Sequence, residues 1–498
     1  MEIVKKRGRP ARIVGLSGKR LWRMSLRMSR YCLSLLVLIG VAMVFLQSKT
    51  QAQTEPSVEN VPAASPSASV IAAPPGSSGV TPLGLGYAPG GASVVDTVSD
   101  LHKRLQEAVG LQIHGMLVGT YEYNFDRPSN GNNTLRVYDY FGSNSPELAQ
   151  GELYIERAVP NQPGFVLDLN TANVAQVQYG LATVYWKVPG REGACPQSPC
   201  GWLDPTRAYL DYTLPFGKGI LITAGTQFPL IGNEAIPSWQ NYNLFQSIGY
   251  VFHASPFNVT GLRAHYAFND YFGLTLGLNN GWSSLASSYP LQTFEGQLGV
   301  NPTSELSLLI NGMYGPQGPT GGNLPSKAGL LDAIATWTPS IDGLNIAQEG
   351  ILGHQDSNAL APAPIIEGPG NPPNPILDEF PDGRTVHPSD WYGEGTWVAY
   401  QVTSRLQLGL RGEVLKDIDG FDTGLPQTLW EITAGFNFKL AEWLVGRFEY
   451  RHDESSQKPF PSAKPLVFFP CPGLETCAAT ASTYHGMDTI LATLMFVF

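Results

Sequence analysis

The chain has 498 residues, only 14% of them charged, and it contains 54 glycines and 40 prolines together with 22 Phe, 21 Tyr and 10 Trp. A composition this rich in turn-forming and aromatic residues, without an excess of Ala, Glu, Lys and Leu, makes helix the minority state. Residues 1–52 hold 11 of the 31 basic and one of the 41 acidic residues, which leaves 20 basic and 40 acidic residues in the rest. That acidic remainder argues against nucleic acid as a partner, because phosphate binding needs clustered Lys and Arg.

The basic N-terminus leads into a 14-residue apolar stretch, LSLLVLIGVAMVFL, at residues 33–46. The small-x-small pattern Thr50-Gln51-Ala52 follows it, which is typical of a Sec-type signal peptide covering residues 1–52. The alternative is an uncleaved anchor, but the apolar stretch is short for a spanning helix of roughly 20 residues. We therefore expect export across the inner membrane.

Residues 53–93 consist mainly of Pro, Ala, Ser and Gly, so they predict a disordered periplasmic linker. Apolar residues then recur at spacings of three and four between Val94 and Val109, which predicts a short amphipathic helix over residues 94–110. This helix either packs on the periplasmic rim, plugs a lumen or forms the seam of a trimer.

From Leu111 the pattern changes to short alternating segments bounded by Gly, Pro, Asn or Asp. We predict sixteen strands, near residues 111–124, 148–158, 163–170, 206–214, 220–228, 259–268, 272–280, 292–300, 305–314, 328–338, 343–353, 391–401, 405–411, 431–438, 443–452 and 484–498. Segments of about ten residues, tilted near 45°, span about 23 Å, close to the apolar band of outer-membrane barrels. The predicted fold is therefore all-β: a closed antiparallel transmembrane β-barrel over residues 111–498, with fourteen or eighteen strands as alternatives.

The last predicted strand ends at Phe498 with an aromatic carboxyl terminus. Ile490, Ala492, Leu494, Phe496 and Phe498 alternate on one face, which we expect to contact lipid, and Thr489 and Thr493 lie on the other. Lipid offers backbone groups no hydrogen-bond partner, so the last strand must close the sheet against residues 111–124.

Candidate lumen residues are the charged side chains on the opposite faces of the strands. They are Arg207, Asp211, Arg263, Glu295, Arg405, Arg411, Glu413, Glu431, Arg447, Glu449 and Arg451. The arginines at 405, 411, 447 and 451 either form a basic stripe at a constriction or pair with carboxylates across the strands. One of the long stretches 171–205, 229–258 and 354–390 should narrow the pore, the alternative being that all three are external loops.

Chemistry other than transport finds little support. The exported part holds Cys195, Cys200, Cys471 and Cys477 in two close pairs, which predict two small loop disulfides, with a zinc site as the alternative. His452 and Asp453 lie where a strand should end, so an ordinary polar lumen wall and rim is favoured over a metal or acid–base site there. No catalytic residue, metal or cofactor is predicted. The tryptophans at 282, 337, 391, 397, 430 and 443 fit the aromatic girdles of a membrane barrel.

Several short segments carry a family resemblance: GTQFPLIGNE at 225–234, TGLR at 260–263, NNGW at 279–282 and RFEYRHD at 447–453, together with Asn241, Tyr242 and Ser247. In these segments the chain resembles the putative β-barrel porin-2, or OmpL-like, family, over about residues 111–498. The resemblance implies an outer-membrane barrel with porin activity and no defined ligand. The long linker and the two cysteine pairs depart from the family's pattern.

The expected function is passive diffusion of small hydrophilic solutes or ions through the bacterial outer membrane. Two other classes stay open: a barrel enzyme, which would need a catalytic group at the outer rim, and a plugged structural or adhesive barrel. The expected partners are outer-membrane lipid, the barrel-assembly machinery that reads the C-terminal strand, and the solutes themselves. A homotrimer is expected by analogy with sixteen-stranded porins.

Overall fold

The computed structural model describes residues 104–128, 133, 135–136, 143–172, 174, 203–240, 243–282, 292–316, 327–356, 388–420, 422–423, 426–461 and 483–498. The predicted signal peptide, the linker and all four cysteines of the predicted disulfides lie outside these residues. Residues 104–109 are helical, and the remainder of the helix predicted over 94–110 also lies outside the described residues. In the part of the chain that is described, no helix is long and apolar enough to span a membrane.

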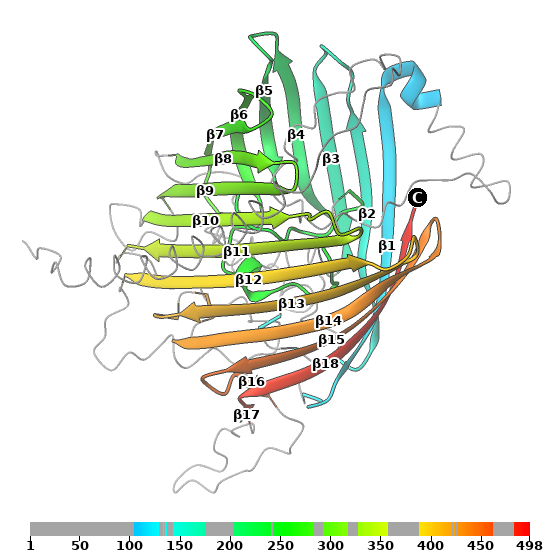
Figure 1. Cartoon of the computed structure of the whole chain (residues 1–498), viewed down its shortest axis with the longest axis vertical. Helices are drawn as coiled ribbons and strands as arrows, with labels where there is room; N and C mark the ends of the chain where they lie inside the picture. The colour runs from blue at the N-terminus through cyan, green and yellow to red at the C-terminus, as the bar shows by residue number, and fades with distance from the viewer. Residues whose placement is uncertain are drawn as a thin grey trace, which may run out of the picture. The chain divides into compact units, whose positions relative to one another are not determined.

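Sixteen antiparallel strands close into one barrel (Figure 1). They are β1 (Leu111–Asn124), β2 (Pro146–Arg157), β3 (Gly164–Thr171), β4 (Asp204–Leu214), β5 (Ile220–Gln227), β6 (Val259–Ala267), β7 (Phe272–Asn279), β8 (Thr293–Thr303), β9 (Leu306–Pro316), β10 (Lys327–Trp337), β11 (Leu344–Gln355), β12 (Ser389–Gln401), β13 (Leu406–Asp417), β14 (Gln427–Ala441), β15 (Leu444–Ser455) and β18 (Gly486–Val497). The predicted fold class and strand number are confirmed. Outside the barrel, β16 (Phe460–Pro461) pairs with β17 (Thr483–Tyr484), a contact that the sequence pattern did not indicate.

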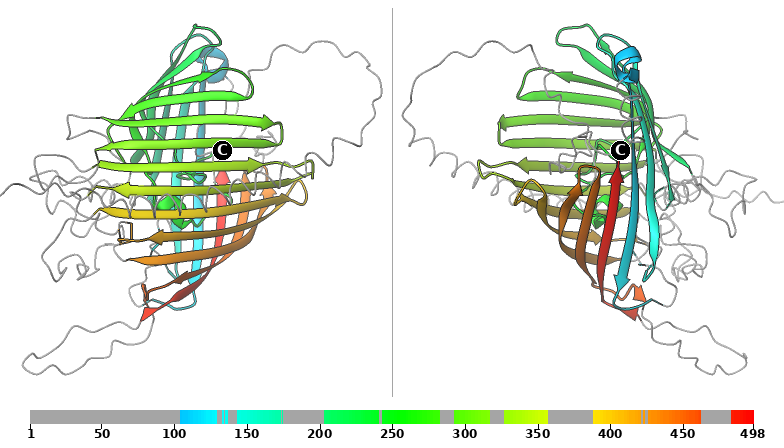
Figure 2. Two further views of the ribbon diagram at one scale, coloured as in Figure 1. Left: turned by 60° about the vertical axis from the view of Figure 1, so that its left-hand side comes forward. Right: turned by 90° about the vertical axis from the view of Figure 1, so that its right-hand side faces the viewer.

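The barrel closes where the first and last strands pair. β1 and β18 are antiparallel from Met116 opposite Val497 to Asn124 opposite Thr489, and the two strands lie side by side in Figure 2. Beyond the ladder, Gly115 and Phe498 exchange two backbone hydrogen bonds of 2.9 and 3.0 Å. The predicted closure is confirmed, so no strand edge of the barrel is left open to lipid.

Alternation along the strands sorts the side chains as predicted. On β18, Leu494 and Phe498 are 55% and 42% exposed on the outer face, whereas Thr489 and Thr493 are 2% and 3% exposed on the inner face. The same rule holds on β14 and β15, where Trp430, Phe436, Phe448 and Tyr450 lie outside and Glu431, Arg447, Glu449 and Arg451 inside. An apolar exterior around a charged interior is the pattern of a membrane barrel.

The connections differ at the two ends of the barrel. At the end that carries Leu111 and Phe498, here the termini end, two to six residues join consecutive strands. At the opposite end, the loop end, the connections have 9 to 33 residues. In outer-membrane barrels the short turns face the periplasm.

The girdle prediction is wrong for three of the six tryptophans. Trp337, Trp430 and Trp443 are exposed on the outside, but Trp282, Trp391 and Trp397 are buried. The physical reason is that glycines without a side chain lie beside the inward rings. A Cβ on Gly353 would lie 1.9 Å from the Trp391 ring and would clash with it. Glycine there makes room for an indole inside the barrel.

Candidate pore constriction

The connection between β5 and β6, residues 228–258, lies inside the barrel; we call it the inserted segment. It is described except for residues 241 and 242, and it contains the short helix α4 (Tyr250–His253), which contacts β12, β13 and β14. The amide of Gly232 binds Asp332 on β10, and the amide of Trp239 binds Glu152 on β2. Because β2 and β10 are eight strands apart around the ring of sixteen, the segment crosses the lumen.

This placement bears on the three long stretches singled out in the sequence. Residues 229–258 fold into the barrel, whereas 171–205 and 354–390 lie mostly outside the described residues.

The segment has little regular structure of its own, so its buried backbone needs partners elsewhere. Carboxylates on the barrel wall accept hydrogen bonds from its amides. The bonds run from Gly232 to Asp332 (3.1 Å), Asn233 to Glu349 (3.0 Å), Trp239 to Glu152 (2.7 Å), Gln246 to Glu449 (2.9 Å) and Val251 to Glu413 (3.0 Å). Each carboxylate thereby satisfies a donor that would otherwise be costly to bury.

Donors on the wall bind the segment's carbonyl groups in turn. Arg411 donates to the carbonyl of Ser247 and Arg451 to that of Ile248, both at 2.7 Å. Further bonds run from Gln150 to Pro237, Arg447 to Asn243, Asn437 to Leu244 and Trp391 to Ala254. Polar side chains on the inner wall thus supply the hydrogen bonds that the backbone of the irregular segment cannot make within itself.

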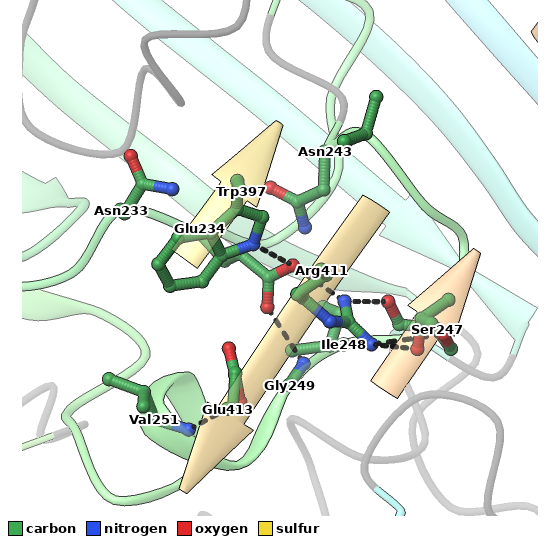
Figure 3. A network of polar contacts seen from close by, with 12 residues as sticks. Asn233, Glu234, Asn243, Ser247, Ile248, Gly249, Val251, Trp397, Arg411 and Glu413 are labelled. Atoms are coloured by element: carbon green, nitrogen blue, oxygen red, sulfur yellow. Dashed lines mark hydrogen bonds and ion pairs between the residues drawn. The ribbon is translucent and has the colours of Figure 1, made fainter. Parts of the chain in front are cut away.

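An ion network centred on Arg411 joins the segment to the wall (Figure 3). Arg411 is fully buried and pairs with Glu234 of the segment at 2.7 Å and with Glu431 on β14 at 2.9 Å. Glu234 also accepts hydrogen bonds from the indole of Trp397 and the amide of Gly249. A buried guanidinium between two carboxylates is stable only when its hydrogen bonds are all made, and here five acceptors surround it.

The network continues along β15. Arg451 pairs with Asp453 at 2.7 Å, and Asp453 also pairs with Arg136 at 2.6 Å. Asp453 is fully buried on the inner face. Asp453 therefore belongs to the polar lumen wall, and the expected strand end near it is wrong, because β15 extends to Ser455 and alternation continues through it.

Ten of the eleven predicted lumen residues lie on the inner face. Nine are buried, Asp211 is partly exposed, and the ten are Arg207, Asp211, Arg263, Glu295, Arg411, Glu413, Glu431, Arg447, Glu449 and Arg451. The prediction for Arg405 is wrong: β13 begins at Leu406, and Arg405 is exposed on the preceding turn, held by Thr403. The remaining arginines pair with acids and carbonyls instead of forming a bare basic stripe, which favours the ion-pairing alternative.

The opposite wall is arranged differently. On β6 and β8, Arg263 and Glu295 form a two-bond ion pair of 2.5 and 3.0 Å, and on β3 and β4 Arg207 pairs with Asp168 at 2.8 Å. Inward residues nearby, among them Tyr209, Thr223 and His265, are partly exposed. The inner face of β12 to β15 is covered by the inserted segment, whereas part of β4 to β6 is not.

Sequence reasoning missed the residues that hold the segment. Glu234 and Ser247 lie in an irregular stretch without periodicity, so no face could be assigned to them. Asp332 and Glu349 lie within predicted strands, and the alternation of those strands could have assigned both side chains to the inner face. Among the described residues no cluster of three or more His, Cys, Asp or Glu could hold a metal ion.

A closed antiparallel barrel with an apolar exterior, a charged interior and a segment folded into its lumen defines an outer-membrane barrel of the porin type. The sequence profile of the putative β-barrel porin-2, OmpL-like family matches residues 110–465, and the chain belongs to this family. Comparison with curated proteins found no match.

Solved structures with a similar fold come from several bacteria. OmpT of Vibrio cholerae is 10% identical, with 78% of this chain and 97% of that chain covered and a TM-score of 0.44. An anion-selective porin of Comamonas acidovorans is 9% identical, with 78% and 99% covered and a TM-score of 0.44. OprB of Pseudomonas putida is 10% identical, with 80% and 97% covered and a TM-score of 0.45.

Proposed function

We propose that the barrel is a channel, and not an enzyme, through which small hydrophilic solutes or ions diffuse passively across the outer membrane. The observation that carries the proposal is the asymmetric filling of the lumen. The inserted segment docks on β10 to β15 and reaches β2 and, through Arg207, β4, while other inward side chains of β4 to β6, among them Tyr209, Thr223 and His265, keep partial exposure. A water-filled path along that wall, narrowed by the segment, is how a large polar barrel conducts.

Bilayer recording tests this directly. The full-length protein, purified and folded in detergent, should insert in defined conductance steps. Replacing residues 229–258 by a short Gly/Ser linker should enlarge each step, because the segment no longer occupies the lumen. A folded barrel that gives no steps in either form would rule out a channel.

A second candidate, a plugged structural barrel, is favoured by the nearly complete burial of the segment, including Ile236 and Val251. The same recordings separate the two candidates. A plugged barrel conducts only after the segment is deleted, whereas a channel conducts in both forms.

The proposed partners are the barrel-assembly machinery and further copies of this chain. We propose that the barrel-assembly machinery reads the strand ending at Phe498, and that three copies associate in the membrane. Chemical cross-linking in outer-membrane vesicles, followed by electrophoresis, measures the number of copies.

A further inference from the structure

The charges inside the barrel differ in their access to water according to sign. The inward arginines on the strands are each 6% exposed or less: Arg207, Arg263, Arg411, Arg447 and Arg451. Each is engaged by a carboxylate, an amide oxygen or a backbone carbonyl. Arg207, Arg263, Arg411 and Arg451 are neutralised by carboxylates, whereas Arg447 is buried against an amide oxygen and a backbone carbonyl. A guanidinium that is paired with a carboxylate and buried in this way adds little to the potential that a passing ion meets.

Two carboxylates on the same inner wall are placed differently. Glu156 on β2 and Asp211 on β4 are both partly exposed, close to the termini end of their strands. Glu156 accepts hydrogen bonds from Tyr154 and Gln240, at 2.6 and 3.3 Å. Neither carboxylate forms an ion pair with a Lys or Arg within the described ranges.

The strand register brings these two carboxylates near each other. Glu156 pairs with Val166 on β3, and Asp211 pairs with Gly164 on the same strand. The carboxylates therefore flank β3 from either side, and their charges repel each other. Only small or apolar side chains of β3 lie between them.

Basic residues at the termini end do not neutralise this pair. Arg157 is tied to the turn after β2 through Pro163 and Gln162, and Lys439 on β14 pairs with Glu442. Lys218 and Arg405 are exposed on turns, Lys218 between β4 and β5 and Arg405 between β12 and β13, so neither lies on the inner wall. The charges of the described inner wall that meet water near this mouth are thus mainly negative.

We propose that Glu156 and Asp211 make the channel prefer cations over anions, an inference that rests on the proposed channel function. A unit charge about 4 Å from an ion in water contributes about 1 kcal/mol, or about a five-fold change in local ion concentration. The effect is screened over about 10 Å at 0.1 M salt and over about 3 Å at 1 M. The carboxylates therefore select most strongly in dilute salt.

Reversal potentials across a tenfold KCl gradient measure the permeability ratio of potassium to chloride. The wild-type ratio should exceed one, and the pair Glu156→Gln with Asp211→Asn should lower it about two- to five-fold. Replacing both by Lys should invert the preference. Asp342→Asn is the matched control, because Asp342 is an exposed acid on a turn at the same end, outside the lumen, and its ratio should equal that of the wild type.

A wild-type channel without cation preference, or a neutralised pair with an unchanged ratio, overturns the inference while the channel function stands. A folded wild-type protein without conductance steps overturns both. The wild-type ratio should also fall toward one when both solutions are raised to molar salt, a measurement that needs no variant.

Discussion

Arg411 is the side chain whose loss should most affect the inserted segment. Arg411→Met removes bonds to Glu234, Glu431 and the Ser247 carbonyl, all at 2.9 Å or less, and leaves Glu234 buried without its cation. Breaking one side of a buried ion pair costs about 3–5 kcal/mol. Since the docked segment bears most of this cost, the undocked population should rise by about two to three orders of magnitude.

Amide hydrogen exchange measures that population. In the wild type, the amides of Gln246, Ser247 and Val251 bind carboxylates inside the barrel, so they should exchange slowly. In Arg411→Met their exchange should accelerate by about 100-fold or more, while amides of the barrel ladder stay protected. Single-channel conductance should become larger and noisier in the same variant.

Lys416→Met is the matched control on the same strand. Lys416 lies on the outer face of β13, where its ammonium nitrogen is 6.0 Å from the centre of the Tyr392 ring. Such a contact is worth about 1 kcal/mol or less, so exchange in the segment should not change. If Arg411→Met exchanges like the control and conducts like the wild type, the network does not hold the segment.

A triple variant isolates the charge effect. Adding Glu234→Gln and Glu431→Gln to Arg411→Met removes the uncompensated carboxylates, and part of the protection should return. No recovery would mean that the hydrogen bonds to Ser247, and not the buried charge, carry the docking energy.

Three further predictions concern the barrel itself. Gly115→Val should lower stability by about 1–3 kcal/mol in urea titrations from lipid vesicles, because a Cβ there would lie 2.2 Å from the Phe498 ring, whereas Gly119→Val, with its nearest contact at 4.0 Å, should not. Gly353→Ala should displace the inward Trp391 ring and alter tryptophan fluorescence, whereas Gly350→Ala, which meets nothing within 4 Å, should leave the spectrum unchanged. The disulfides Cys195–Cys200 and Cys471–Cys477 stay predictions: peptide mass mapping without reductant should find both, and free thiols at all four positions would refute them. Their reduction should cost only about 2 kcal/mol for each small loop.

The barrel could be predicted from the sequence because each residue of a membrane strand faces either lipid or the lumen. The two environments favour different residue types, so apolar and polar residues alternate along the strand. Period-two alternation located all sixteen strands, most of them to within a few residues, and assigned Phe496 and Phe498 to the outside. It failed at Arg405, where the alternation runs one residue past the true start of β13. It also failed at Trp391 and Trp397, where glycines allow large rings on the inner face.

The site was only half predictable for a related reason. Inward residues such as Arg411 and Glu449 follow from parity, but their partners lie in a segment without periodicity. Glu234 pairs with Arg411, which lies 177 residues further along the chain, and a local sequence pattern cannot predict a contact at that separation. The same separation explains why the sequence left two alternatives open for the arginines, a basic stripe or ion pairs across the strands, of which Arg411 and Arg451 follow the second.

The inserted segment also constrains the order in which the protein can be built. Its partners Asp332, Glu349, Glu413 and Glu449 follow it by about 100 to 200 residues, so the segment has its full set of partners only when β10 to β15 have formed. Contacts this distant in sequence form late, after the intervening chain has been ordered. Because the segment binds both β2 and β15, its docking joins walls that meet only across β1 and β18. The segment that narrows the lumen thus also ties together the two sides of the seam at which the barrel closes.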